Sequence, residues 1–180
     1  MEYVQFYNRI PLKMVFQNRF DGSVNFTRKF LEYINGFGSI TGEFWLGLKY
    51  IEEMSAQGST EMRIDLTAAD NSHAYEVYPN FHLGTNPGYN LHINNGTGTA
   101  GDSSGLSYHN GSPFSTYDHD NGHICAFSDR GGWWYLNCAY ANLNGEYFTP
   151  GSVYGEHGMI YYNFKFLESL KTSKMMFRRV

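Results

Sequence analysis

The chain has 180 residues and a formal net charge of −4, and 18% of its residues are aromatic, with fifteen tyrosines among them. This length suits one domain that can bury a sizeable core without a metal or extra cross-links. The negative charge argues against a nucleic-acid surface, which needs clustered lysine and arginine, and no apolar run approaches the ~18 residues of a transmembrane helix.

The N-terminal third predicts strand structure followed by two helices. Residues 3–20 contain near-alternating apolar runs separated by Pro11, which predict two strands, or one strand after an extended lead-in. From Asn25 the apolar positions take helical spacing, with Asn25 as the N-cap and Asn35-Gly36 as the end of the helix. A second short helix is predicted over residues 48–55.

The next segments alternate apolar and polar residues and predict strands. They cover residues 61–66, 74–78 and 81–83, and further strand candidates lie at residues 159–162 and 175–177. The economical arrangement is one antiparallel sheet with helices beside it, which is an α+β fold.

Residues 94–122 lack regular patterning and are mostly Gly, Ser, Asn, Asp and Thr. Alone, that composition would indicate disorder. Four larger side chains interrupt it, namely Leu106, Tyr108, Phe114 and Tyr117. Because a long ordered loop in a compact domain is usually functional, we expect this loop to contribute to a site.

The two cysteines, Cys125 and Cys138, stand thirteen positions apart and flank a Trp133-Trp134-Tyr135 block. They predict a disulfide-closed loop that carries an aromatic strand, and such a closure contributes about 3 kcal/mol. The alternative is a pair of buried free thiols, since cysteine is among the most buried residue types.

Several motifs occur in a characteristic order. Gly-Gly-Trp-Trp-Tyr and Asn-Leu-Asn-Gly follow the first cysteine, and further motifs lie at residues 15–26, 36–48, 98–102 and 106–111. In this order they closely resemble the fibrinogen C-terminal (fibrinogen-related) domain, over essentially all of residues 14–179. The resemblance implies a central twisted antiparallel sheet with short helices and a long loop-rich C-terminal subdomain.

The same resemblance implies one domain over residues 1–180. Its sheet and helices would occupy about residues 14–90, and its loop-rich calcium- and ligand-binding part about residues 91–180. The family usually has a further N-terminal subdomain with its own disulfide, and that cysteine pair is missing from this sequence. The chain therefore resembles a truncated or divergent member with a reduced N-terminal part.

A calcium site is implied by the resemblance at Asp118, Asp120 and Gly122. Alternate carboxylates suit calcium when backbone carbonyls complete the shell. The family pattern is Asp-x-Asp-Asn-Asp, and Gly122 stands here in place of the final acid, so the alternative is that these acids solvate a turn. A zinc site at His119 and His123 is disfavoured because no set of three or four ligands has convincing spacing.

The resemblance also implies a shallow ligand cleft beside the disulfide, which accepts acetyl groups in lectin-like members. One wall is the peptide bond before the second cysteine, so Asn137-Cys138 is expected to be cis despite a cost of about 3 kcal/mol. The far wall matches Tyr154, Gly155 and Phe166.

Two departures from the family pattern alter this expected cleft. Ala139 stands where a histidine commonly follows the second cysteine, and Asp129 stands where a tyrosine is often found. Fibrinogen itself has an acid at that place, paired with another that aligns with Glu156, and the two receive a positively charged N-terminal peptide. Asp129 and Glu156 are therefore expected to favour an amine over a neutral acetyl group, unless they are simply exposed carboxylates on loops.

The function implied is an extracellular recognition module with lectin-like binding of acetylated or related glycan groups, as in innate-immune pattern recognition. The alternative is a protein- or peptide-binding module, as in fibrinogen assembly, angiopoietin-like receptor ligands or tenascin-like matrix proteins. The expected partner is a glycan or a protein, with no nucleic acid and no membrane span in this chain. Oligomerisation would use segments outside this sequence.

Secretion fits three glycosylation sequons, at Asn25, Asn95 and Asn110. The first residues lack the basic start and apolar core of a signal peptide, so such a signal is expected outside this sequence. A hydrolase built from Asp102, His109 and nearby serines is disfavoured because no nucleophile-elbow motif fixes their geometry.

Overall fold

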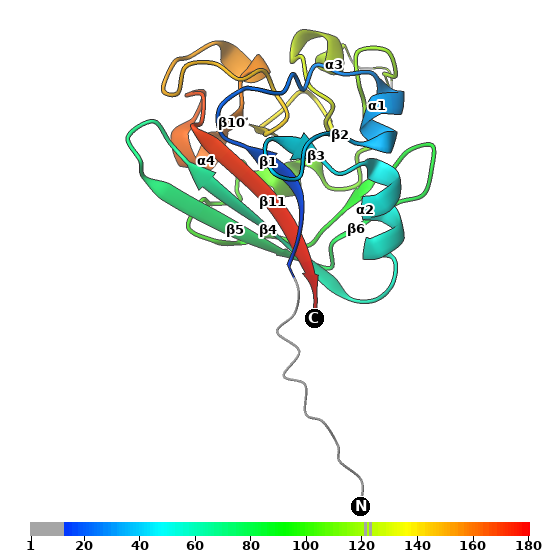
Figure 1. The fold of residues 1–180 in the computed structure, drawn as a ribbon. Coiled ribbons are helices and arrows are strands. Elements are labelled where there is room, and N and C mark those ends of the chain that lie inside the picture. The colour runs from blue at the N-terminus through cyan, green and yellow to red at the C-terminus, as the bar shows by residue number, and fades with distance from the viewer. Residues whose placement is uncertain (1–12, 121, 123) are drawn as a thin grey trace, which may run out of the picture.

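The computed structural model describes residues 13–120, 122 and 124–180, and Figure 1 shows how they are arranged. A seven-stranded antiparallel sheet forms the centre, in the order β2-β3-β1-β11-β4-β5-β8. Its strands are β1 (Met14–Arg19), β2 (Phe37–Gly38), β3 (Phe44–Trp45), β4 (Thr60–Thr67), β5 (His73–Pro79), β8 (Thr97–Gly98) and β11 (Thr172–Arg179). Two smaller sheets pair β6 (His82–Leu83) with β7 (Leu91–His92), and β9 (Ala141–Asn142) with β10 (Ile160–Tyr161).

The helices are short. They are α1 (Phe30–Asn35), α2 (Leu48–Ser55), α3 (Cys125–Ser128) and α4 (Tyr162–Lys165), with 3-10 turns η1 (Leu106–His109) and η2 (Gly155–His157). α1 and α2 contact each other beside the sheet (Figure 1). Each helix in the described part of the chain is too short or too polar to cross a bilayer. The antiparallel sheet and short helices confirm the α+β fold, and the predicted second helix is confirmed at its predicted bounds.

Strand β4 shows how the sequence forms the sheet. Its burial alternates along the strand, with Met62, Ile64 and Leu66 buried and the residues between them half-buried. Side chains of a strand point alternately to its two faces, so one face of β4 enters the core. β11, the last strand in the chain, lies between β1 and β4 and pairs with both along most of its length.

The prediction that the first helix begins at Asn25 is wrong, because α1 begins at Phe30. The Asn25 Oδ1 accepts the Thr27 N–H at 2.8 Å, so this side chain closes a local turn instead of capping a helix. At the true start, the Glu32 carboxylate accepts the Lys29 N–H at 3.1 Å. The predicted strand structure is seen as β1, while the part of that prediction at residues 3–12 lies outside the described residues.

The loop over residues 94–122 is held to the sheet by Asp102. Its Oδ1 accepts hydrogen bonds from the Tyr78 hydroxyl at 3.0 Å and the Ser107 N–H at 3.1 Å, and its Oδ2 accepts the Gly96 N–H at 2.7 Å. A partly buried network of this kind fixes a loop that carries few regular elements. Asp102 therefore has a structural role, which is to hold this loop to the sheet.

Candidate functional site

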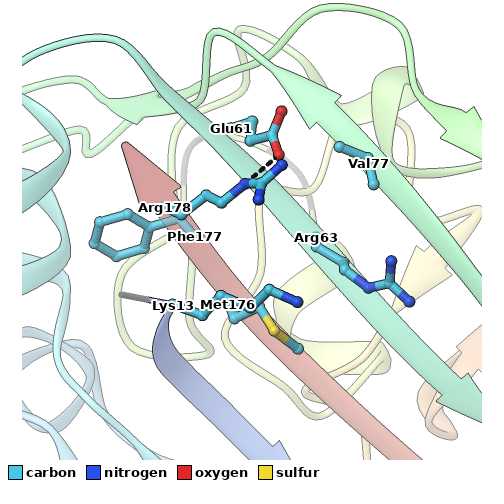
Figure 2. Close-up of a pocket in the computed structure, with 7 residues that line it drawn as sticks. All are labelled: Lys13, Glu61, Arg63, Val77, Met176, Phe177 and Arg178. Atoms are coloured by element: carbon cyan, nitrogen blue, oxygen red, sulfur yellow. Dashed lines mark hydrogen bonds and ion pairs between the residues drawn. The ribbon is translucent and has the colours of Figure 1, made fainter. Parts of the chain in front are cut away.

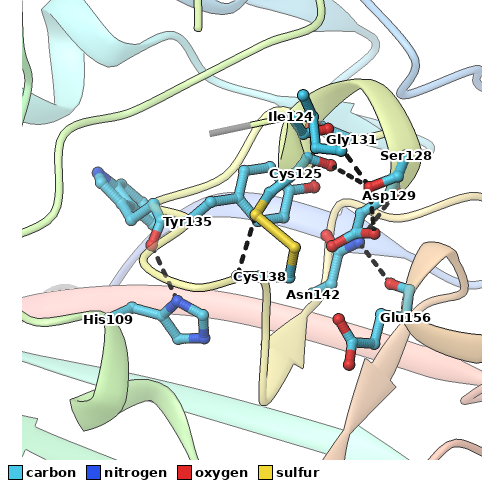
Figure 3. The surroundings of a disulfide bond; sticks show 11 residues. His109, Ile124, Cys125, Ser128, Asp129, Gly131, Tyr135, Cys138, Asn142 and Glu156 are labelled. Atoms are coloured by element: carbon cyan, nitrogen blue, oxygen red, sulfur yellow. Dashed lines mark hydrogen bonds between the residues drawn. A yellow bond between two sulfur atoms is a disulfide. The ribbon is translucent and has the colours of Figure 1, made fainter. Parts of the chain in front are cut away.

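A disulfide bond joins Cys125, the first residue of α3, to Cys138. The two Cα atoms are 5.1 Å apart, and the Cys138 N–H donates to the Cys125 Sγ at 3.0 Å. Figure 3 shows Asp129 and Glu156 beside this bond. The predicted cross-link is confirmed, and the free-thiol alternative is excluded.

The peptide bond between Asn137 and Cys138, predicted to be cis, is trans. In the part of the chain that the structure describes, the cis bond lies at Asn86-Pro87. Cys138 instead has a φ of 54°, in the left-handed region that few non-glycine residues adopt. The cis prediction is therefore wrong, and the left-handed φ of Cys138 is the unusual backbone feature at this position.

The Trp133-Trp134-Tyr135 block between the cysteines is buried. The Trp134 Nε1–H donates to the Tyr89 carbonyl oxygen at 2.8 Å, which satisfies the one polar atom of that ring. Gly132 permits this packing, because a Cβ added there would lie 2.5 Å from the ring of Tyr33. The disulfide loop therefore rests on a rigid aromatic layer.

His109 is part of this rigid layer and is not available for catalysis. It is fully buried. Its Nε2 accepts the Ala141 N–H at 3.3 Å, so its Nδ1–H donates to the Trp134 carbonyl oxygen at 2.8 Å. Burial lowers the pKa of His109 to about 4, and the bond to Trp134 only partly opposes this. With both ring nitrogens engaged, the imidazole cannot serve as a general base.

Asp129 and Glu156 come together at the disulfide. One carboxylate oxygen from each of them and the Cys138 Sγ all lie within 4.8 Å of one another. Asp129 follows α3 and is only 4% exposed, while Glu156 lies in η2 and is half-buried. The predicted pairing of these two acids is therefore present, and the alternative of two exposed loop carboxylates does not describe Asp129.

One oxygen of the Asp129 carboxylate lacks a hydrogen-bond donor. Its Oδ1 accepts the Ser128 hydroxyl at 3.1 Å, whereas Oδ2 is buried without a partner among the described residues. Burial raises the pKa of Asp129 to about 6, the Ser128 bond opposes the rise, and the negative charge of Glu156 adds to it. A buried carboxylate oxygen without a donor is unfavourable, so this atom is suited to an incoming N–H group.

Asn142 positions the two acids, and the sequence interpretation missed it. Its Nδ2 donates to the carbonyl oxygens of Asp129 at 3.1 Å and of Glu156 at 3.0 Å. Asn142 belongs to β9 and is fully buried. The available signal was the Asn-Leu-Asn-Gly motif, in which two buried asparagines are unusual unless their amides have defined partners.

The acidic pair does not form a metal site of ordinary composition. It belongs to the one group of three or more potential ligands found in the described residues, and the third member is Cys138. Because the Cys138 sulfur is already bonded to Cys125, it is no thiolate and cannot bind a metal as one. Two carboxylates are then left, which also match a cationic nitrogen group.

Of the three predicted calcium residues, Asp118 has other hydrogen-bond partners. Asp118 Oδ1 accepts the Phe30 N–H at 3.0 Å and the Thr116 hydroxyl at 2.7 Å, so this carboxylate connects its loop to the start of α1. Asp120 and Gly122 are exposed, and they stand next to positions outside the described residues. The proposed zinc ligand His123 also lies outside them, whereas the His119 ring stacks on Phe30 at 3.9 Å.

The remaining predicted ligand residues occupy different environments. Asn137 is exposed, and Ala139 is buried in the core and offers no side-chain hydrogen bond. Tyr154 is 52% exposed and stacks on Phe148 at 4.3 Å. Gly155 begins η2 with a φ of 75°, which glycine adopts readily.

A depression on the outer face of the central sheet differs from the acidic pair in how its charges are matched (Figure 2). Its volume is about 170 Å³. Arg178 Nε donates to Glu61 Oε1 at 2.6 Å, and beside it Arg63 Nε donates to Asp65 Oδ1 at 2.7 Å. Exposed pairs of this kind contribute at most ~1 kcal/mol and have their charges matched. The Asp129–Glu156 pair is therefore the better candidate for a ligand site.

Comparison with known families gives a match over residues 12–180. The matching family is described as the C-terminal globular domain of fibrinogen beta and gamma chains. The chain is 48% identical over 142 residues to fibrinogen C domain-containing protein 1-B of Xenopus laevis, which covers 74% of this chain and 31% of that protein. This chain thus spans about a third of the length of the curated relatives of that name.

Two solved structures are similar in fold. The fibrinogen-like globe domain of human ANGPTL6 matches with a TM-score of 0.88 and 36% identity, covering 92% of this chain and 77% of that one. A lamprey fibrin D-dimer complexed with the peptide ligand Gly-His-Arg-Pro-amide matches with a TM-score of 0.85 and 34% identity, covering 92% of this chain and 60% of that one.

Proposed function

Because this chain belongs to the fibrinogen C-terminal domain family, we propose that it is an extracellular recognition module that binds a cationic nitrogen group of a glycan or protein at Asp129 and Glu156. The family and the matched relatives are binding modules without enzymatic activity. A binding role is also consistent with His109, whose ring nitrogens are both engaged in the core.

The observation that carries the proposal is the buried Asp129 Oδ2, which has no donor among the described residues and lies beside a second carboxylate. A ligand ammonium or guanidinium would supply N–H donors to that oxygen and compensate both negative charges. The lamprey fibrin D-dimer carries a peptide ligand that contains an arginine, which supports the same chemistry for this chain.

Lectin-like binding of acetylated sugars is the second candidate. It is favoured by exposed aromatic side chains near Glu156, among them Tyr140 and Phe166, because such rings suit the apolar face of a sugar. Against it stands Ala139, which is buried and adds no hydrogen bond. An acetyl group would also leave Asp129 without a charged partner.

We propose that ligand binding does not require calcium. Asp118 already accepts two hydrogen bonds that join its loop to α1, so its carboxylate holds this loop in place. Extracellular location is proposed because a structural disulfide persists in oxidising compartments. A single weak site of this kind would gain avidity in multimers formed through other segments.

An array of glycans and peptides, probed with and without a calcium chelator, tests the proposal. Ligands with a free amine or guanidinium should bind in both conditions, and Asp129→Asn with Glu156→Gln should remove that binding. Asp65→Asn is the matched control, since this acid is half-buried on the sheet and paired with Arg63. Unchanged binding of cationic ligands by the double variant, or binding limited to acetylated sugars with calcium, would reject it.

A further inference from the structure

Four aromatic side chains form a continuous row next to Glu156. We call them the aromatic row: Tyr108, Tyr140, Tyr162 and Phe166. Successive ring centroids are 4.5, 5.1 and 4.7 Å apart. Tyr140 and Tyr162 flank the pairing of β9 with β10, in which Ile160 lies opposite Asn142, and the Asn142 Nδ2 donates to the Glu156 carbonyl oxygen at 3.0 Å. The middle of the row therefore lies beside the acidic pair, and its two ends extend away from that pair.

Phe166 is the outlier in this row. Its side chain is 60% exposed, and its backbone has a φ of 52° and a ψ of −120°. Glycine adopts such a conformation freely, whereas a side chain there raises the free energy of the folded state. Because most of the ring is exposed, burial of apolar surface does not offset that cost. A strained, exposed aromatic residue beside a ligand site indicates a role in binding.

Tyr140 and Tyr162 present both ring and hydroxyl groups. Tyr140 is 37% exposed and Tyr162 is half-buried. The backbone N–H of Tyr162 donates to the Tyr140 carbonyl oxygen at 2.9 Å, which holds the two rings in register. A partner that matches them has an apolar face and polar edges, since rings of this type contact apolar surface while their hydroxyls reach donors or acceptors.

We propose that the aromatic row binds the pyranose ring of an amino sugar whose ammonium group is held by Asp129 and Glu156. This inference rests on the proposed function and specifies its ligand class. An amino sugar carries its amine directly on the ring, which matches a row of aromatic rings that lies beside Glu156. A lysine side chain or a peptide N-terminus brings the charge without a ring beside it.

Calorimetric titration with a trimer of β-linked glucosamine, its N-acetylated counterpart and Gly-His-Arg-Pro-amide tests the inference. The glucosamine trimer should bind about tenfold more tightly than the acetylated one, because only the amine compensates the two carboxylates. Phe166→Gly should weaken glucosamine binding about five- to tenfold through loss of ring contact. This variant relieves the unfavourable backbone, so it should fold at least as well as the native chain.

Tyr50→Ser is the control, since Tyr50 is 43% exposed on α2 and outside the row; it should bind all three ligands as the native chain does. Native glucosamine affinity in Phe166→Gly, or preference for the acetylated trimer, would overturn the inference. Asp129-dependent binding of the peptide without binding of the glucosamine trimer would overturn the inference and leave the proposed function standing. Absence of binding by all three ligands would overturn both.

Discussion

Two buried carboxylates of this molecule have opposite surroundings. Glu43 is 1% exposed and accepts four backbone N–H groups from residues 20–24, at 2.7 to 3.1 Å. Asp129 is 4% exposed and has one oxygen without a donor in the described residues. Burial raises the pKa of both groups, but at Glu43 the four donors outweigh it and hold the pKa below the usual value.

The difference separates a group that holds the fold from one that is suited to a ligand. Glu43 also lies near the buried Arg19, whose guanidinium sits 4.1 Å from the Phe26 ring centroid. Its hydrogen-bonding capacity is met by the chain itself, so nothing is left for an external partner. Asp129 has capacity that the chain does not meet, which is expected where a ligand completes the site.

Removing Glu43 should have the largest effect. Glu43→Ala leaves four turn N–H groups without their acceptor and Arg19 without a nearby negative charge, so it should lower the free energy of unfolding by about 3–5 kcal/mol. Urea denaturation followed by circular dichroism measures this. A loss below about 1 kcal/mol would show that the two carboxylates do not differ in the way described.

Breaking the disulfide should have the second-largest effect on stability. Cys125→Ser with Cys138→Ser should lower the free energy of unfolding by about 3 kcal/mol, because the closed loop no longer restricts the unfolded chain. It should also weaken binding of cationic ligands, since Cys138 adjoins both acids. Denaturation and calorimetry on the same variant test the two effects. Full affinity in the double variant would show that Asn142 alone holds the acidic pair.

The sequence predicted those parts of the fold that depend on local pattern. The alternation of Met62, Ile64 and Leu66 defines one face of β4, and the apolar spacing of residues 48–55 defines α2. The predicted start of α1 was wrong because an asparagine side chain can either cap a helix or close a turn. The sequence alone does not show which of the two Asn25 does.

The candidate site was predictable in its membership more than in its geometry. The resemblance to the family implied that Asp129 and Glu156 pair, but it did not give the burial of Asp129 or the hydrogen bonds from Asn142. Those depend on contacts between segments far apart in the chain. The trans bond before Cys138 was likewise not predictable from the local sequence. The φ of 54° at Cys138 is set by the surrounding loop.

Converting Asp129 to an amide should raise stability and weaken binding. Asp129→Asn removes a buried charge that lies beside Glu156, so it should increase the free energy of unfolding by about 1–2 kcal/mol at neutral pH. The same change should lower the affinity for cationic ligands about tenfold or more. Thermal denaturation and calorimetry measure these effects. Destabilisation would mean that the Asp129 charge is compensated in the folded chain, as that of Glu43 is.

The smallest expected effect is a pH dependence in which stability and affinity change in opposite directions. The folded-state pKa of Asp129 is raised from 3.8 to about 6, so between these values the folded chain binds the proton more strongly than the unfolded chain. The contribution of Asp129 to stability is therefore greatest at low pH and declines as the pH rises from about 4 to about 6. Affinity for a cationic ligand should instead increase as the pH rises through 6, because the ligand requires the ionised carboxylate.

Other acids titrate in the same range, so the comparison is made as the difference between the native chain and Asp129→Asn at each pH. The difference in unfolding free energy should grow in favour of the variant up to about pH 6 and then level off. The difference in affinity should grow in favour of the native chain across the same interval. Flat differences would mean that Asp129 is ionised throughout, with a donor for its second oxygen, and the contrast with Glu43 would then be lost.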